Sequence, residues 1–205
     1  SVEYVERLYA GGRIKGSRWV KREGRPSDDA VLAGRVIDRS IRPFFPKSFK
    51  RDVQVIITVL SIDGENDPDV LGLVATSAAI AISPIPWNGP VSGVRVGYVK
   101  DNGNSTYLIN PTVTEQGLSE FDFVVSSSRD TTVMLEGGFC ETPEDIVYGA
   151  GLKAKEANVK IIDLIDTLVK EVGKPKIQVP VVSAADKLKA KIVKDYKKEM
   201  DKAFA

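Results

Sequence analysis

Apolar residues along the chain follow two spacings, one typical of strands and one typical of helices. β-Branched residues fill 53–62, and further apolar runs are separated by short polar turns, which predicts buried strands. The polar turn at 101–105 lies between two such runs and indicates a hairpin, and a second hairpin follows it. The predicted strands are residues 1–10, 53–62, 91–99, 106–109, 121–126 and 131–136.

Capping residues mark where the helices begin. Ser27 precedes two aspartates and Asp67 precedes Pro68, and both patterns are typical of the first turn of a helix. A third start leads into apolar residues at helical spacing that continue to Gly173. The predicted helices are residues 27–39 with Pro43 as a stop, 67 to the prolines at 84 and 86, 142–173, and the lysine-rich segment 183–205.

The order of these elements predicts an α/β (α+β) fold for a core over residues 1–173. Residues 174–182 contain two prolines and no charge after Lys176, which is typical of a linker. The amphipathic segment 183–205 is then expected to begin a second, all-helical domain. Because the chain starts abruptly in a strand without an initiating methionine, we expect it to be part of a longer protein.

Composition excludes several kinds of chemistry. The 205 residues include no histidine and one cysteine, so Ser-His-Asp and Cys-His triads, imidazole metal sites and an internal disulfide are excluded. We expect Cys140 to be a small buried apolar residue. The longest apolar stretch, 71–82, is too short and too polar to span a bilayer. We therefore expect no membrane segment or secretory signal, and a cytoplasmic location.

Charge is segregated along the chain, although the net charge is +1. Twelve basic and four acidic residues lie between Arg13 and Arg51, whereas eight acidic residues and one arginine lie between Thr114 and Asp145. Such asymmetry predicts a basic surface that faces a polyanion.

The basic region combines arginines with an aromatic side chain. In the sequence RWVKREGRP, Trp19 stands among cations, and this combination fits single-stranded nucleic acid because bases stack on the indole while cations neutralise phosphates. Alternatively, Trp19 packs against the domain and the cations are merely exposed. The candidate residues in this loop are Arg18, Trp19, Lys21, Arg22 and Arg25.

Three arginines follow the loop on one helical face. Arg35, Arg39 and Arg42 have i, i+4, i+7 spacing, so they could contact one phosphate-lined strand together. The alternative is a solvated face whose arginines pair with Asp38 and other acids.

Two motifs do not support nucleotide hydrolysis. GGRIKG at 11–16 has the spacing of neither the dinucleotide fingerprint nor the P-loop. The serines at 126–128 could cradle phosphate, but their place at a strand end favours a solvated turn.

Four stretches resemble the first ribonuclease PH-like core of the bacterial polynucleotide phosphorylase (polyribonucleotide nucleotidyltransferase) family. They are REGRPSDDAVLAGRVIDRSIRPFFPKSF, VQVIITVLSIDGENDPDVLGLVATSAAIAIS, PIPWNGPVSGVRVGYV and YLINPT. The resemblance implies a ribonuclease PH-like core that lacks its first strands, followed by the start of a helical domain. It also implies phosphate-dependent 3′-to-5′ degradation of RNA, with magnesium and inorganic phosphate required by the full enzyme. The implied partners are single-stranded RNA, a second core, C-terminal KH and OB-type RNA-binding domains, and two further copies in a ring-shaped trimer.

The resemblance also assigns RNA contacts. The family narrows its channel with two phenylalanines followed by two basic residues, and Trp19, Val20, Lys21 and Arg22 match these positions. Arg18 is then an extra residue, and Val20 lacks the aromatic face for stacking. The three helix arginines match arginines that the family places near the RNA path.

The catalytic pattern of the family's second core is not matched. Its phosphate-binding serines correspond here to residues 67–69, where two aspartates would repel phosphate and instead cap the helix. Its metal-binding aspartates correspond to Asp122 and Gln116, and its lysine to Val124. We therefore predict no catalytic residue, metal or cofactor in this chain, which guides RNA while a second core supplies the chemistry. The alternative is a stand-alone, non-catalytic RNA-binding scaffold.

Overall fold

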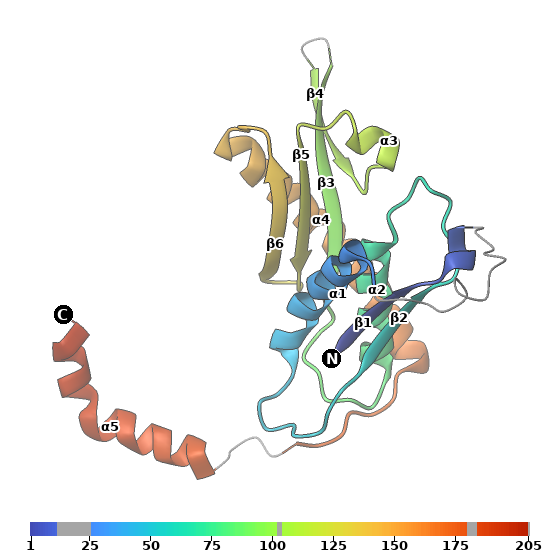
Figure 1. Cartoon of the computed structure of the whole chain (residues 1–205). Helices are drawn as coiled ribbons and strands as arrows, with labels where there is room; N and C mark the ends of the chain where they lie inside the picture. Colours follow the sequence, from blue (N-terminus) through green and yellow to red (C-terminus); the bar gives the residue numbers. More distant parts are fainter. Residues whose placement is uncertain (12–25, 102–103, 180–183, 205) are drawn as a thin grey trace.

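The computed structural model describes residues 1–11, 26–101, 104–179 and 184–204 (Figure 1). Two sheets and the helices packed on them make up the body of this part of the chain. The helices are α1 (Asp28–Ile41), α2 (Pro68–Ile82), α3 (Val113–Gln116), α4 (Glu144–Val172) and α5 (Ala184–Phe204), with 3-10 turns at Leu8–Gly11 and Arg42–Phe44. The strands are β1 (Val2–Glu6), β2 (Val55–Val59), β3 (Ser92–Asp101), β4 (Asn104–Ile109), β5 (Phe121–Ser127) and β6 (Thr132–Phe139).

β1 and β2 form a small parallel sheet, paired from Val2 opposite Val55 to Glu6 opposite Val59. Because side chains alternate between the faces of a strand, Tyr4 and Ile57 point to the same side. There they join the core formed with α1 and α2. The two helices therefore cover one face of this sheet.

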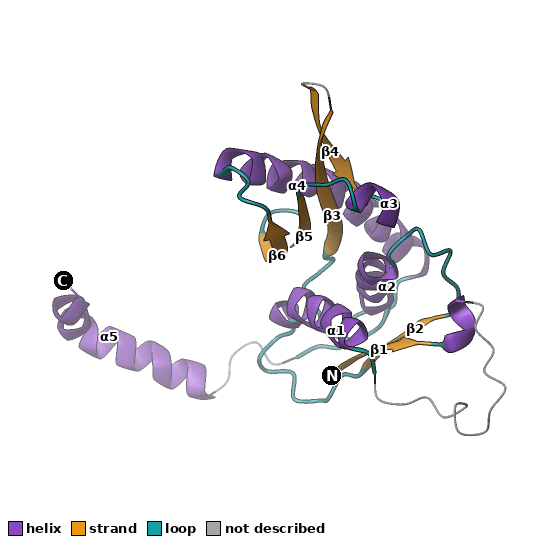
Figure 2. Ribbon diagram, turned by 45° about the horizontal axis from the view of Figure 1, so that its top comes forward, coloured by secondary structure: helices purple, strands orange, loops and turns teal. Residues whose placement is uncertain are grey.

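The second sheet is antiparallel, with strand order β4-β3-β5-β6. α4 covers one of its faces, where Val94, Val96, Phe123 and Val125 pack against Ala150 and Ala154 of the helix. α1 and α2 cover part of the opposite face, where α1 contacts β6 and α2 contacts β3 (Figure 2). Helices α1 and α2 thus lie between the two sheets.

The C-terminal end of α1 is held by a buried tryptophan. Trp87 is 6% exposed, and its Nε1 donates a hydrogen bond of 3.0 Å to the carbonyl oxygen of Ile41. Phe44 and Phe45 pack against its ring at centroid distances of 6.2 and 6.3 Å. Since the last carbonyls of a helix have no partner within it, this contact satisfies one of them.

The segment after α4 crosses the C-terminal end of α2. The Nζ of Lys176 lies 2.8 Å from the carbonyl oxygens of Ile80, Ala81 and Ser83 and donates to all three. The backbone N–H of Lys174 also donates to the Ile82 carbonyl at 2.9 Å. Burial lowers the pKa of Lys176, but its charge is favoured beside the negative end of the helix dipole.

The observed elements confirm the predicted fold class and most element positions. Ser27 caps α1, with Ala30 N donating to its Oγ at 3.0 Å, and Asp67 caps α2 with Pro68 in the first turn. Both hairpins are present. The first strand is shorter than predicted, because the chain leaves the sheet after Glu6 and forms a 3-10 turn.

Two predictions about small residues are wrong, one of them in part. Ser126 and Ser127 are fully buried in β5, where Ser126 Oγ accepts a hydrogen bond of 2.9 Å from Ser40 Oγ of α1. Ser128 lies in the turn before β6, as predicted. Cys140 is exposed just after β6 and is not part of the core. In both cases the usual burial of the residue type was a poor guide, because tertiary packing determines which side chains are covered.

We expect Lys176→Met to lower the free energy of unfolding by about 1–3 kcal/mol, because three carbonyl oxygens lose their shared donor. Chemical denaturation of the variant and the parent chain measures the difference. Lys174→Met is the matched control, since the hydrogen bond of Lys174 is made by its backbone and its side chain has no hydrogen bond or ion pair with a described residue. An equal loss of stability in both variants would contradict the role given to the Lys176 ammonium.

Candidate functional site

The arginines predicted to bind RNA lie on the solvent side of α1. The helix buries Ala33, Val36 and Ile37 against the core, so residues at other helical angles face water. Arg35 and Arg39 are exposed on this side, and Arg42 is exposed at the C-cap. The three side chains therefore share one open face, as their spacing predicted.

Ion pairs distinguish the three arginines. Arg42 binds Asp38 in a bidentate pair, with Nη2 2.6 Å from Oδ1 and Nε 2.9 Å from Oδ2. Arg39 lies 3.7 Å from Glu136 of β6, which is too long for a strong hydrogen bond. Arg35 makes no ion pair with any described residue. The alternative interpretation, pairing with nearby acids, thus describes Arg42 and, at a longer distance, Arg39, whereas Arg35 has no ion pair with a described residue.

The other candidate RNA contacts lie outside the described residues. Their roles in stacking and phosphate binding stay predictions from the sequence. They are Arg18, Trp19, Lys21, Arg22 and Arg25.

The N-terminal end of α2 meets the second sheet at a buried arginine. Arg95 of β3 donates from Nη2 to Asp69 at 2.6 Å and to Asp67 at 3.1 Å, and from Nη1 to Asp122 at 2.5 Å. The side chains of Arg95 and Asp69 are 10% and 12% exposed. One guanidinium group thus joins α2, β3 and β5.

The sequence prediction missed Arg95. Asp122, which corresponds to a metal-binding aspartate of the family's second core, shares this cation with Asp67 and Asp69. A signal was present, because Arg95 stands between Val94 and Val96 inside an apolar strand. A charge in such a place must have partners, although sequence alone does not name them.

Burial and charge perturb the titration of this cluster. Burial raises the pKa of Asp69, and attraction to Arg95 offsets part of that shift. Burial lowers the pKa of Arg95, but the three aspartates raise it more strongly, so the net direction is upward. Burial and then the charges of Glu6, Asp69 and Asp67 raise the pKa of Tyr4. The phenol and the guanidinium therefore both stay protonated at neutral pH.

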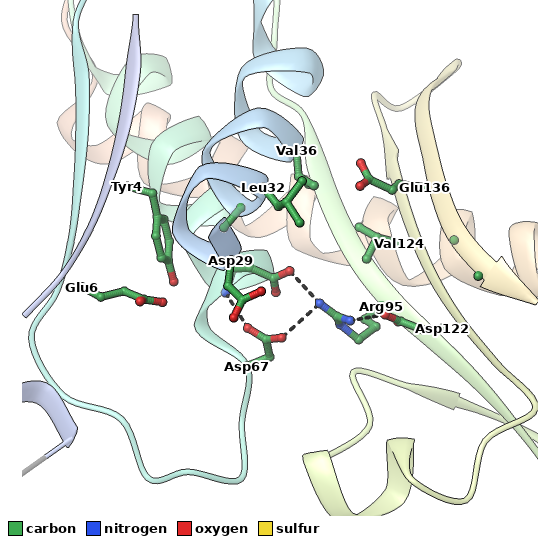
Figure 3. Close-up of a pocket in the computed structure, with 14 residues that line it drawn as sticks. Tyr4, Glu6, Asp29, Leu32, Val36, Asp67, Arg95, Asp122, Val124 and Glu136 are labelled. Atoms are coloured by element: carbon green, nitrogen blue, oxygen red, sulfur yellow. Dashed lines mark hydrogen bonds and ion pairs between the residues drawn. The ribbon is translucent and has the colours of Figure 1, made fainter. Parts of the chain in front are cut away.

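These residues line a pocket of about 440 Å³ between α1, the small sheet and the larger sheet (Figure 3). Six carboxylates and one guanidinium line it, so its formal charge is strongly negative. Val124 lines the same pocket, whereas Gln116 does not and instead donates to the Pro111 carbonyl at 3.2 Å. The six acids are Glu6, Asp29, Asp67, Asp69, Asp122 and Glu136.

This arrangement does not fit phosphate or a magnesium ion. Phosphate would meet carboxylates at the helix N-terminus, where an anion site needs free N–H groups and no negative charge. The three converging aspartates already bind Arg95, and within the described ranges no group of acids or cysteines is placed to hold a metal. We therefore derive no catalytic step through either group in this chain.

Comparison with known families agrees with the fold. A model described as "3' exoribonuclease family, domain 1" matches residues 1–86, and one described as "3' exoribonuclease family, domain 2" matches residues 89–157. Together they cover about three quarters of the chain. The chain therefore belongs to the 3′ exoribonuclease family, whose fold is that of ribonuclease PH.

Two similar curated proteins carry the same enzyme name. A polyribonucleotide nucleotidyltransferase of Caldicellulosiruptor saccharolyticus is 47% identical over 192 residues, which is 94% of this chain and 27% of the relative. The enzyme of the same name from Dehalococcoides mccartyi strain CBDB1 is 42% identical over 205 residues, 100% of this chain and 28% of the relative. The chain thus spans about a quarter of the length of these relatives. The resemblance seen in the sequence is confirmed.

None of the described helices is both long enough and apolar enough to cross a bilayer.

We expect Arg95→Gln to lower the free energy of unfolding by about 3 kcal/mol at pH 7, because it leaves the buried Asp69 without its cation. Without the offset from Arg95, the folded-state pKa of Asp69 rises further above its unfolded value. The folded state then binds protons more readily than the unfolded state, so the lost stability returns as pH falls toward about 4.

Arg129→Gln is the matched control for this prediction. Arg129 also binds two aspartates, Asp163 at 2.7 Å and Asp166 at 2.9 Å, but in an exposed position. Its replacement should cost much less stability, since water screens exposed pairs. Denaturation curves of both variants between pH 4 and 7 test the difference, and a pH-independent loss in Arg95→Gln would contradict it.

Proposed function

We propose that this chain is the RNA-guiding and assembly core of a phosphate-dependent 3′-to-5′ exoribonuclease that takes part in mRNA degradation. The relatives named polyribonucleotide nucleotidyltransferase support this assignment of the whole enzyme. In the proposal, the chemistry belongs to a second core that requires magnesium and inorganic phosphate. This chain guides single-stranded RNA toward that core.

The observation that supports this division of roles between two cores is the acidic pocket at the start of α2. Asp67 and Asp69 lie where a phosphate site would need uncharged donors, and Arg95 fills the space between them and Asp122. The exposed Arg35 and Arg39 supply positive charge on the solvent side of the neighbouring α1. Anion binding is thus favoured on the helix surface and disfavoured in the pocket.

We propose a matching organisation of the chain. Residues 1–173 form the first ribonuclease PH-like core, 174–182 a linker, and 183–205 the beginning of a helical domain. Exposed apolar residues of α5, such as Leu188 and Ile192, support a further helical partner for this segment. The whole enzyme would be a cytoplasmic homotrimer with a second core and C-terminal RNA-binding domains.

Arg35→Gln and Arg39→Gln should each weaken binding of single-stranded RNA and lower the steepness of its salt dependence. Each lost phosphate contact reduces the slope of log K against log[salt] by about 0.7. Fluorescence anisotropy with a labelled oligoadenylate at several salt concentrations measures both effects. Lys160→Gln is the control for net charge, because Lys160 is exposed on α4 and has no ion pair in the described structure. An equal change in affinity and salt dependence in Lys160→Gln would contradict the proposed contact between RNA and this face of α1.

The chain alone should release no nucleoside diphosphate from poly(A) in the presence of magnesium and inorganic phosphate. The physical reason is that its phosphate position is acidic and its aspartates are bound to Arg95. The product of the full open reading frame should be active in the same assay. Phosphorolysis by the chain alone would overturn the division of labour, and an inactive full product would favour a non-catalytic RNA-binding scaffold.

A further inference from the structure

The pocket on the inner side of α1 has the charge pattern of a site for an organic cation. We propose that it binds an aliphatic polyamine, with ammonium groups held by carboxylates at two ends of the pocket and methylene groups lying on an apolar wall between them. This proposal does not depend on RNA binding. It rests on the side chains that line the pocket of about 440 Å³, a volume suited to a small organic molecule.

The first end of the pocket has carboxylates and an unpartnered phenol. Glu6 of β1 and Asp29 of α1 line it, and the Tyr4 side chain points toward them (Figure 3). Tyr4 is 5% exposed, yet its hydroxyl group has no hydrogen-bond partner among the described residues. The phenol oxygen reaches the pocket, where it is free to accept a hydrogen bond from a bound ligand. An ammonium group between these side chains would donate to the phenol oxygen and to the carboxylates.

The second end has an unsatisfied carboxylate. Glu136 of β6 lines the pocket, and its Oε2 is buried without a hydrogen bond from any described residue. Its cation, Arg39, stands 3.7 Å away. A second ammonium group would supply the donor that Arg39 is too distant to provide.

An apolar surface connects the two ends. Leu32 and Val36 of α1 and Val124 of β5 lie between Asp29 and Glu136 (Figure 3). Leu32 is 48% exposed, so part of this apolar surface is open to a ligand. Methylene groups of a ligand would be shielded from water on this surface, which is favourable. The surface offers no partner for a charged group.

The same geometry disfavours a metal ion. The three carboxylates that converge on one point already bind Arg95, while Glu6, Asp29 and Glu136 are distributed along the pocket. A compact divalent ion needs ligands around one centre. A cation with separated charges matches the distribution that is present.

Isothermal titration calorimetry of the 205-residue chain with putrescine and with spermidine at low salt measures affinity and stoichiometry and tests the proposal. We expect saturable binding of one polyamine per chain, tighter for spermidine, and weakened by salt because exposed charges are screened. Butylamine, with one ammonium group, should bind at least about tenfold more weakly than putrescine, since it loses one charge-assisted contact. Absence of saturable binding, or equal binding of butylamine, would overturn the proposal.

Variants locate the site. Asp29→Asn and Glu136→Gln change one charge each at opposite ends, and Tyr4→Phe removes only the hydroxyl group. Each should weaken binding by about threefold to tenfold. Glu171→Gln is the control, because Glu171 is exposed at the end of α4 and lies outside the pocket. Circular dichroism checks that each variant folds. If Tyr4→Phe does not fold, the affinities of Asp29→Asn and Glu136→Gln still test the location of the site.

A competition experiment distinguishes a specific polyamine site from general binding of counterions. Magnesium chloride and sodium chloride are compared at equal ionic strength in the presence of bound spermidine. Equal displacement by the two salts supports a site for the organic cation. Much stronger displacement by magnesium, or unchanged spermidine affinity in both Asp29→Asn and Glu136→Gln, would overturn the proposal.

Discussion

The ion pairs of Arg95 hold the helices and the large sheet in one arrangement. The guanidinium group contacts three aspartates, two from the start of α2 and one from β5, at 2.5–3.1 Å. A buried charge of either sign is unstable without its partners, so the strand that carries Arg95 and the helix that carries Asp69 must stay in register. The same contact determines what this pocket can bind. Its strongest cation-binding point is already filled from within the chain, and its negative surplus repels phosphate.

Helix α1 separates two opposite charge environments. Its inner side contributes Asp29, Leu32 and Val36 to the acidic pocket, while Arg35 and Arg39 lie on its outer side. The ion pair between Arg39 and Glu136 lies where these environments meet. Because both sets of charges lie on one helix of 14 residues, a change in charge on one side alters the electrostatic field on the other. RNA guidance and polyamine binding are therefore proposals about two surfaces of one element.

Local signals in the sequence predicted where helices and strands lie. The features that the sequence did not predict depend on contacts between distant residues. Ser27, Asp67 and Pro68 marked helix starts, since capping depends on residues one to three positions away. Arg95 was missed because its partners lie 26 to 28 positions away. Ser126 was misplaced because the contact with Ser40 spans 86 positions. The RNA contacts at 18–25 lie outside the described residues and stay predictions.

Lys176 gives α2 a second anchor of opposite character to the first. The helix begins at acids bound to Arg95 and ends at carbonyls bound to Lys176, so both terminal partial charges are compensated. Its 15 residues make a rod of about 22 Å between these anchors. The segment after α4 and the acidic pocket are therefore joined through a single helix, each of them contacting one of its ends.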